Sequence, residues 1–232
     1  MTTFTPAPVL IVPGYHGSAA AHWQVWLQRQ WPHSRLLTGV DWDKPVLATW
    51  SEQIRDEIAR AREPLWIVAH SFGCLASVVA AADRPQSVAA LVLVAPAEPA
   101  RFNLLGLGSA DDRRLEVHTL ADVLPDTALN VPGLVLASSN DPWMSTASAQ
   151  VWARRWQLEL QEVGALGHIN VDSGHGPWPD LLHRLSAWQA RQGAATGVIP
   201  GIAHRMPRGR GSLLSQVRRH TRRQLDILSL SS

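Results

Sequence analysis

The sequence predicts an α/β fold with a mainly parallel sheet of about six strands and helices on both of its faces. Short, almost continuously apolar runs alternate with longer segments of helical periodicity, and such runs are typical of strands buried on both sides. The expected strands are residues 8–14, 36–40, 65–69, 88–95, 134–138 and 158–163. The expected helices are residues 22–31, 46–62, 72–82, 142–156 and 177–191.

The individual elements follow from their residue patterns. Residues 8–14 form an apolar run that ends in a Pro-Gly turn, whereas residues 36–40 form a weaker run. The helix expected at 46–62 is amphipathic. Its apolar face consists of Leu47, Trp50, Ile54 and Ile58. The segment 97–130 is less regular.

The composition is that of one globular domain, which we expect to span residues 1–192. Of the 232 residues, 46% are hydrophobic, and eleven are Trp against three Phe and one Tyr. We therefore expect some indole rings to line a pocket or surface. Cys74 is the one cysteine, so an intrachain disulfide is excluded and the thiol is expected to be buried. A signal-peptide pattern and an apolar run of about 20 residues are both absent, which favours a cytoplasmic location.

The basic character of the chain belongs to its C-terminal end. Residues 193–232 carry seven arginines and one acidic residue, whereas residues 1–192 carry more acidic than basic side chains. We expect an extension there that is flexible or forms a short amphipathic helix at 212–230. Such a helix can contact an anionic membrane or an acidic partner, but an extension without function is the simpler interpretation. Nucleic-acid binding is not expected, because residues 193–232 contain no aromatic side chain to stack on bases.

The sequence Ala69-His-Ser-Phe-Gly73 places Ser71 between the strand at 65–69 and the helix at 72–82. Small residues two positions before and after a serine let the strand and helix approach closely. The sharp turn between them exposes the hydroxyl, as in a nucleophile elbow. A serine that only caps the helix is the alternative interpretation. The pattern predicts that Ser71 is a nucleophile.

An activated serine needs a base and an acidic residue that orients the base, which follow in the order Ser, Asp, His on this architecture. Asp141 comes directly after the strand at 134–138, although it could also serve as an N-cap before Pro142. His168 and His175 both follow the last strand. We favour His168 as the base, because its shorter tether to the strand holds the ring better.

Backbone N–H groups are expected to stabilise the oxyanion. One is that of Phe72, after the nucleophile, and the second is that of Tyr15, with His16 close behind. The loop at 13–18 lacks the glycine and lysine spacing of a nucleotide-binding loop. No histidine has partners at metal-ligand spacing, so neither a metal nor a cofactor is expected. The candidates for lining the substrate pocket are His16, His70, Trp143, His175 and Trp178.

These motifs resemble the small serine hydrolases of the retinoblastoma-binding-protein type, in the α/β-hydrolase superfamily, and are most similar to their bacterial members. The resemblance covers about residues 8–192. The matching segments are Pro13-Gly-Tyr15, His22-Trp-Gln24, the elbow at 69–73, Ser139-Asn-Asp-Pro142, Gly167-His-Ile-Asn170 and Ser173-Gly-His-Gly-Pro-Trp-Pro179. The resemblance implies a catalytic triad of Ser71, Asp141 and His168 and a hydrolase without a large cap domain.

The predicted activity is hydrolysis of a carboxyl ester or amide of a small substrate, through an acyl-enzyme on Ser71. Trp143 and Trp178 are expected to narrow the pocket toward small or flat substrates. Two alternatives remain open from the sequence. One is a protein-binding module on a hydrolase scaffold without catalysis, and the other is an acyltransferase that uses the same three residues.

Overall fold

The computed structural model describes residues 8–108 and 118–196. Six strands form one sheet in the order β2-β1-β3-β4-β7-β8, and every neighbouring pair in it is parallel. The strands are β1 (Val9–Val12), β2 (Ser34–Leu36), β3 (Leu65–Ser71), β4 (Val88–Pro96), β7 (Gly133–Ala137) and β8 (Glu159–Glu162). The predicted parallel α/β fold is confirmed.

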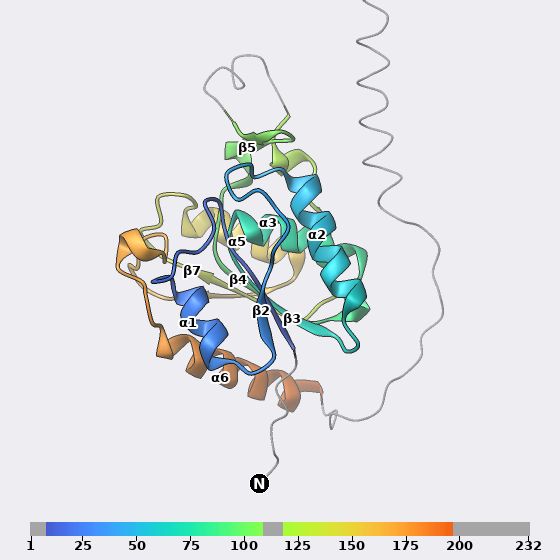
Figure 1. Ribbon diagram of the computed structural model, residues 1–232, viewed down its shortest axis with the longest axis vertical. Coiled ribbons are helices and arrows are strands. Elements are labelled where there is room, and N and C mark those ends of the chain that lie inside the picture. The colour runs from blue at the N-terminus through green and yellow to red at the C-terminus, as the bar shows by residue number, and fades with distance from the viewer. Residues whose placement is uncertain (1–7, 109–117, 197–232) are drawn as a thin grey trace, which may run out of the picture. The chain divides into compact units, whose positions relative to one another are not determined.

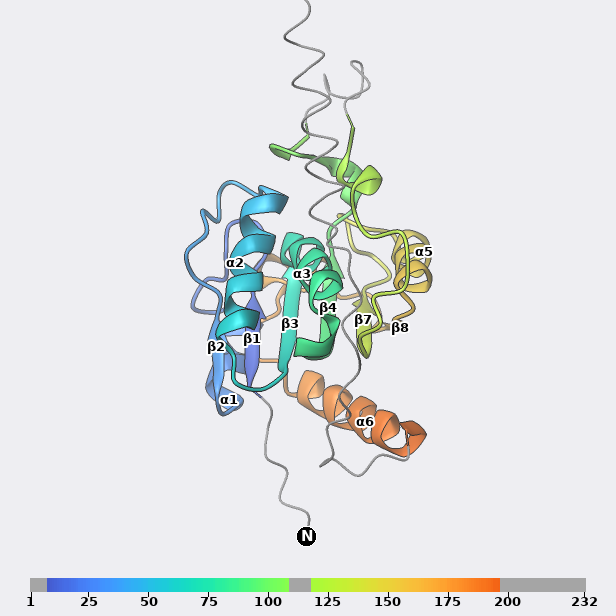
Figure 2. The ribbon, with the colours of Figure 1, turned by 90° about the vertical axis from the view of Figure 1, so that its right-hand side faces the viewer.

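Helices cover both faces of the sheet, as predicted. They are α1 (Trp23–Gln30), α2 (Leu47–Arg60), α3 (Phe72–Asp83), α5 (Thr146–Trp156) and α6 (Pro179–Thr196). Helices α2, α3 and α5 lie over one face and α1 over the other (Figures 1 and 2). Because the sheet is sandwiched, β3 is buried along its whole length, which explains the unbroken apolar run at residues 65–69.

Large indole rings build much of the core. Trp23, Trp50 and Trp156 are at most 1% exposed, so these three rings pack rather than line a pocket. Each indole N–H is satisfied by a loop carbonyl: Trp23 donates to Ile169, Trp50 to Lys44 and Trp156 to Pro125. These bonds fasten loops to the core, because a buried N–H without an acceptor is costly.

Several predicted boundaries differ from the structure, and two of the differences have a clear local cause. The second strand is Ser34–Leu36 rather than 36–40, because the chain turns at Gly39, whose φ is +83°. Helix α5 starts at Thr146 rather than 142, because Ser145 is its N-cap and accepts a hydrogen bond from the Ser148 N–H at 3.1 Å. Asp141 is therefore not a helix cap.

The segment after β4 contains a small antiparallel hairpin of β5 (Phe102–Asn103) and β6 (Gly106–Leu107), together with single turns of 3-10 helix. Those turns, here and elsewhere, are η1 (Pro85–Ser87), η2 (Pro99–Arg101), η3 (Leu120–Asp122) and η4 (Val171–Ser173). Within the part of the chain that the structure describes, no helix is long and apolar enough to cross a membrane.

The chain divides into two units, residues 1–185 and 186–232. The first contains the whole sheet, and Leu181 and Leu185 at the start of α6 are buried in it. Of the second unit only residues 186–196, the end of α6, are described. The predicted amphipathic helix at 212–230 lies outside the described residues, and so does nearly all of the predicted basic extension.

Candidate active site

The turn from β3 into α3 has the geometry of a nucleophile elbow. Ser71 is the last residue of β3 and directly precedes α3, with φ of 52° and ψ of −125°. A non-glycine residue rarely adopts a positive φ, and such strain is typical of functional positions. The strained turn places the Ser71 side chain at the carboxyl end of the sheet, where open α/β sheets bind their ligands.

Two glycines make this turn possible. A Cβ at Gly73 would overlap the carbonyl oxygen of Pro13, and a Cβ at Gly14 would lie 2.7 Å from the Cβ of Ser71. Gly73 was part of the predicted elbow. Gly14 lies at the start of the loop after β1, and its role was not predicted.

The structure brings Ser71, Asp141 and His168 together. The Ser71 hydroxyl lies 2.8 Å from Nε2 of His168. Nδ1 of the same ring lies 2.9 and 3.0 Å from the two carboxylate oxygens of Asp141. A carboxylate accepts, so Nδ1 carries the ring proton and Nε2 is free to accept the serine proton. Ser71 and His168 are largely buried, each 7% exposed.

The Asp141 carboxylate is held in place by the backbone that follows it. Its Oδ1 accepts the N–H of Trp143 at 2.8 Å, and the side chain is 2% exposed. This bond closes a tight turn before α5. The turn explains why the carboxylate faces the histidine instead of capping the helix.

The loop that carries His168 is anchored to the end of β7 by two polar side chains. Ser138 accepts the Leu166 N–H at 2.9 Å, and Asn140 accepts the Gly167 N–H at 2.7 Å. The Ser138 hydroxyl in turn donates to Asn140 at 2.9 Å. These roles were not predicted, although both residues stand within three positions of Asp141 in the sequence, which was a usable signal.

His175 does not reach the serine. Its Nδ1 lies 3.2 Å from the carbonyl oxygen of Ser173, and its ring packs edge-on against Trp178 with centroids 5.9 Å apart. Of the two histidines that the sequence left as candidate bases, the structure places His168 beside the hydroxyl.

Two backbone N–H groups remain as candidate oxyanion donors. Phe72 is the first residue of α3, so its N–H has no acceptor within the helix. The His16 N–H donates to the Trp42 carbonyl at 2.9 Å, which removes it as a donor to substrate. The Tyr15 N–H is therefore the better candidate from that loop.

The family comparison agrees with this geometry. A family model described as "Serine hydrolase" matches residues 9–187. This range includes Ser71, Asp141 and His168. The chain belongs to the serine hydrolase family. No curated protein matches the sequence.

Solved structures place this serine hydrolase in the α/β-hydrolase fold. A YdeN-like hydrolase from Pectobacterium atrosepticum is 35% identical with a TM-score of 0.67, covering 79% of this chain and 91% of that one. The ydeN gene product of Bacillus subtilis is 22% identical with a TM-score of 0.60, covering 79% and 99%. Est1E of Butyrivibrio proteoclasticus, solved with ferulic acid, is 14% identical with a TM-score of 0.58, covering 84% and 92%.

Aromatic rings of this serine hydrolase lie next to the triad geometry. The centroid of the Trp143 ring lies 5.7 Å from that of the His168 ring and 6.4 Å from that of Phe102. The centroids of Phe102 and Phe72 are 4.9 Å apart. The guanidinium of Arg101 lies 5.2 Å from the centroid of the Trp143 ring. Phe102 belongs to the hairpin segment and was not predicted as a site residue.

The other predicted pocket residues point elsewhere. His16 is exposed and pairs with Asp43 at 2.8 Å. Trp178 is 7% exposed and packs edge-on against Trp23 with centroids 5.7 Å apart. His70 is buried behind the histidine loop, 4% exposed.

Burial keeps two histidines behind the site neutral. Burial first, then the charge on His168 and His175, lowers the pKa of His22 to about 4. Burial, and then the charges of His168 and His22, lowers the pKa of His70 well below its ordinary value. Burial also raises the pKa of Cys74 well above that of a free thiol, and the thiol is buried, as predicted.

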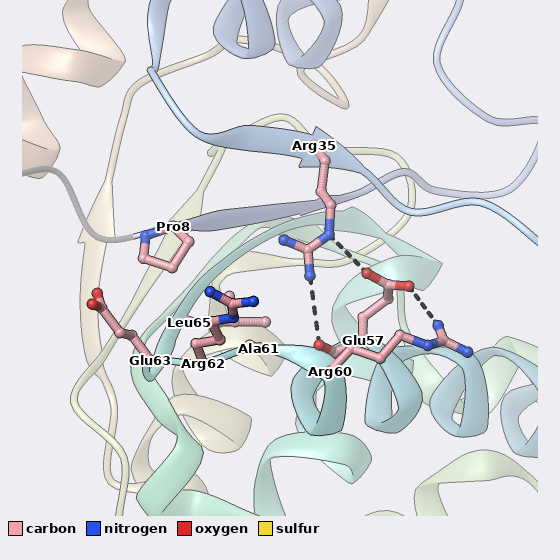
Figure 3. A pocket seen from close by; sticks show the side chains of 8 residues that line it. All are labelled: Pro8, Arg35, Glu57, Arg60, Ala61, Arg62, Glu63 and Leu65. Atoms are coloured by element: carbon pink, nitrogen blue, oxygen red, sulfur yellow. Dashed lines mark hydrogen bonds and ion pairs between the residues drawn. The ribbon is translucent and has the colours of Figure 1, made fainter.

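A cavity of about 440 Å³ lies at the opposite end of the strands (Figure 3). Its lining is Pro8, Arg35, Glu57, Arg60, Ala61, Arg62, Glu63 and Leu65. Burial raises the pKa of Glu57, but the hydrogen bonds and charges of Arg35 and Arg60 outweigh it and hold the pKa below its usual range. The charges are thus largely paired, and the lining holds no nucleophile or histidine. Nowhere in residues 8–108 and 118–196 do three or more His, Cys, Asp or Glu side chains gather as a metal site.

Proposed function

We propose that this protein hydrolyses a carboxyl ester or amide of a small substrate through an acyl-enzyme on Ser71. The observation that carries the proposal is the continuous chain of hydrogen bonds from Ser71 Oγ through His168 to Asp141. The residue-level resemblance to the retinoblastoma-binding-protein type of hydrolase agrees with it, and we propose that the chain belongs to that branch.

In the proposed first step, Ser71 Oγ attacks the acyl carbonyl carbon while His168 Nε2 takes the hydroxyl proton. Asp141 stabilises the resulting imidazolium without taking its proton. The carbonyl π electrons move to the oxygen, which the N–H groups of Phe72 and Tyr15 then stabilise. Helix α3 begins at this point, and the positive end of its dipole adds to that stabilisation.

In the following steps the tetrahedral intermediate collapses, and His168 gives its proton to the departing alcohol or amine. Water then attacks the acyl-enzyme with His168 again as the base. This attack releases the carboxylic acid and restores the Ser71 hydroxyl. An alcohol or amine acceptor in place of water would give acyl transfer from the same intermediate.

Hydrolysis of short p-nitrophenyl esters tests this proposal. We expect Ser71→Ala and His168→Ala each to lower kcat by ~10³-fold or more. His175→Ala is the matched control and should lose much less, because its ring does not contact Ser71. A larger loss in His175→Ala than in His168→Ala would contradict the choice of base. Equal turnover by Ser71→Ala and wild type would contradict the proposal, and so would an inactive wild type, which would favour a binding module.

We also propose that the acyl group is small or flat, because the ring of Trp143 stands beside His168. Arg101 donates a hydrogen bond to the Pro142 carbonyl at 2.7 Å, and its guanidinium lies over the Trp143 ring. These two contacts hold the Trp143 ring in place. Trp143→Ala should raise the kcat/KM ratio of long-chain to short-chain esters. A wild type that prefers long-chain esters would contradict this assignment.

A further inference from the structure

His70 is a buried imidazole at the end of β3, immediately before Ser71. Its Nε2 lies 2.9 Å from the backbone carbonyl oxygen of His168. A carbonyl can only accept, so Nε2 of His70 carries the ring proton and donates it. The residue before the nucleophile is thus bonded to the main chain of the residue that serves as the proposed base.

We propose that His70 is a positioning residue that fixes the backbone of His168 relative to Ser71. This inference rests on the proposed function, because it concerns the alignment of the same base. The sequence analysis treated His70 as a candidate pocket residue, but the structure places its ring between the strand end and the histidine loop.

The need for such a bond follows from the shape of the histidine loop. Gly167 and Ile169, on either side of His168, both have positive φ, at 60° and 49°. This conformation is rarely adopted by Ile and persists only where the surroundings impose it. Without external bonds, the backbone at His168 would relax and carry the imidazole away from the hydroxyl.

The bonds around this loop act on successive residues. Asn140 holds the Gly167 N–H at 2.7 Å, and the Trp23 indole donates to the Ile169 carbonyl at 2.8 Å. The bond from His70 acts between these two, at the carbonyl of His168 itself. Because His70 and Ser71 are consecutive on one strand, this bond fixes the backbone of the base relative to the nucleophile.

The identity of the residue also matters for charge. The rings of His70 and His168 have centroids 4.9 Å apart, and His168 becomes a cation when it takes the serine proton. A cationic side chain at position 70 would oppose that step. The groups facing His70 are His22 and His168, and its burial keeps the imidazole neutral, with a pKa well below the ordinary value. A neutral histidine therefore meets both requirements: its N–H reaches the His168 carbonyl, and it adds no positive charge beside His168.

The competing interpretation is that His70 only fills space between His168, His22 and Trp23, whose rings surround it. The two interpretations differ in what a substitution must preserve. Packing requires volume, whereas positioning requires a neutral N–H donor at the place of Nε2. Gln carries an amide N–H₂ at about that reach. Asn carries the same group but ends short of it, which makes Asn a matched control.

The test compares His70→Gln, His70→Asn and His70→Leu with wild type, using p-nitrophenyl acetate and thermal unfolding. We expect His70→Leu and His70→Asn to lower kcat by ~10²-fold with KM changed less than about twofold, as for a misplaced catalytic group. His70→Gln should recover most of that loss. The proton NMR signal of the His168 Nδ1–H, bonded to Asp141, should broaden or disappear in the Asn variant and persist in the Gln variant.

Equal losses of kcat in the Gln and Asn variants, or wild-type kcat in either His70→Asn or His70→Leu, would overturn the proposal. If His70→Leu does not fold, the comparison of kcat between His70→Gln and His70→Asn still tests the proposal. An inactive wild type would contradict the proposed function instead, and the NMR signal of His168 would then still report whether the bond from His70 orders the loop.

Discussion

The pH dependence of stability tests whether His22 is a buried neutral group behind the active site. Its Nδ1 accepts the Gln24 N–H at 3.2 Å and so caps α1, which requires an unprotonated nitrogen. His22→Asn removes the titration but keeps a side chain that caps a helix well. The two proteins therefore differ chiefly in one ionisable group.

The expected magnitude follows from the pKa of His22, which is lowered from 6.5 to about 4. The unfolded chain takes up a proton near pH 6.5, whereas the folded chain takes it up only near pH 4. The free energy of unfolding therefore falls as the pH is lowered through that window. At roughly 1.4 kcal/mol per pKa unit the full loss is about 3 kcal/mol, of which about 2 kcal/mol is lost by pH 5.

Urea unfolding of wild type and His22→Asn at several pH values between 7.5 and 5 measures this effect. Other carboxylates and histidines titrate in both proteins, so the difference between them isolates His22. We expect wild type to lose about 2 kcal/mol more than the variant over that range. A difference that stays constant to within about 0.5 kcal/mol would refute the reasoning.

Three further substitutions have defined outcomes. Gly73→Ala should unfold or markedly destabilise the protein, seen as a loss of soluble folded material, because its Cβ overlaps the Pro13 carbonyl; a normal melting temperature would contradict this. Asn140→Ala should lower kcat about tenfold, because the histidine loop loses the bond from the Gly167 N–H. A substitution of the exposed neighbour, Ser139→Ala, should match wild type in the same ester assay. Equal rates for the two variants would contradict the role of Asn140 in holding the loop. Asp141→Asn should lower kcat by ~10⁴-fold, because the amide favours the wrong imidazole tautomer; a loss below tenfold would contradict its orienting role.

The residues that the structure brings together at the site could be predicted because topology restricts them. Parallel strands carry their functional loops at one end of the sheet, so residues that follow β3, β7 and β8 meet there whatever their separation in sequence. Ser71 is the last residue of β3, and Asp141 lies four positions after the end of β7. The choice of His168 over His175 used the same logic, since a short tether limits how far a ring can move.

The supporting residues could not be predicted from the same patterns. His70 and Trp23 hold the histidine loop by donating hydrogen bonds to its backbone carbonyls, and a backbone acceptor leaves no mark in the sequence. Composition alone could not tell which tryptophans pack in the core and which, like Trp143, lie beside the site, because an indole with a loop carbonyl in reach packs in a core as readily as in a pocket. Phe102 was missed because the short hairpin that places it has no clear periodicity.

The proposed reaction depends on Ser71 as the activated nucleophile. Its most direct test is labelling with a fluorophosphonate probe, followed by peptide mass spectrometry. We predict one adduct on wild type, located on Ser71, and none on Ser71→Ala under the same conditions. Equal labelling of the two proteins, or an adduct on a different residue, would contradict the claim.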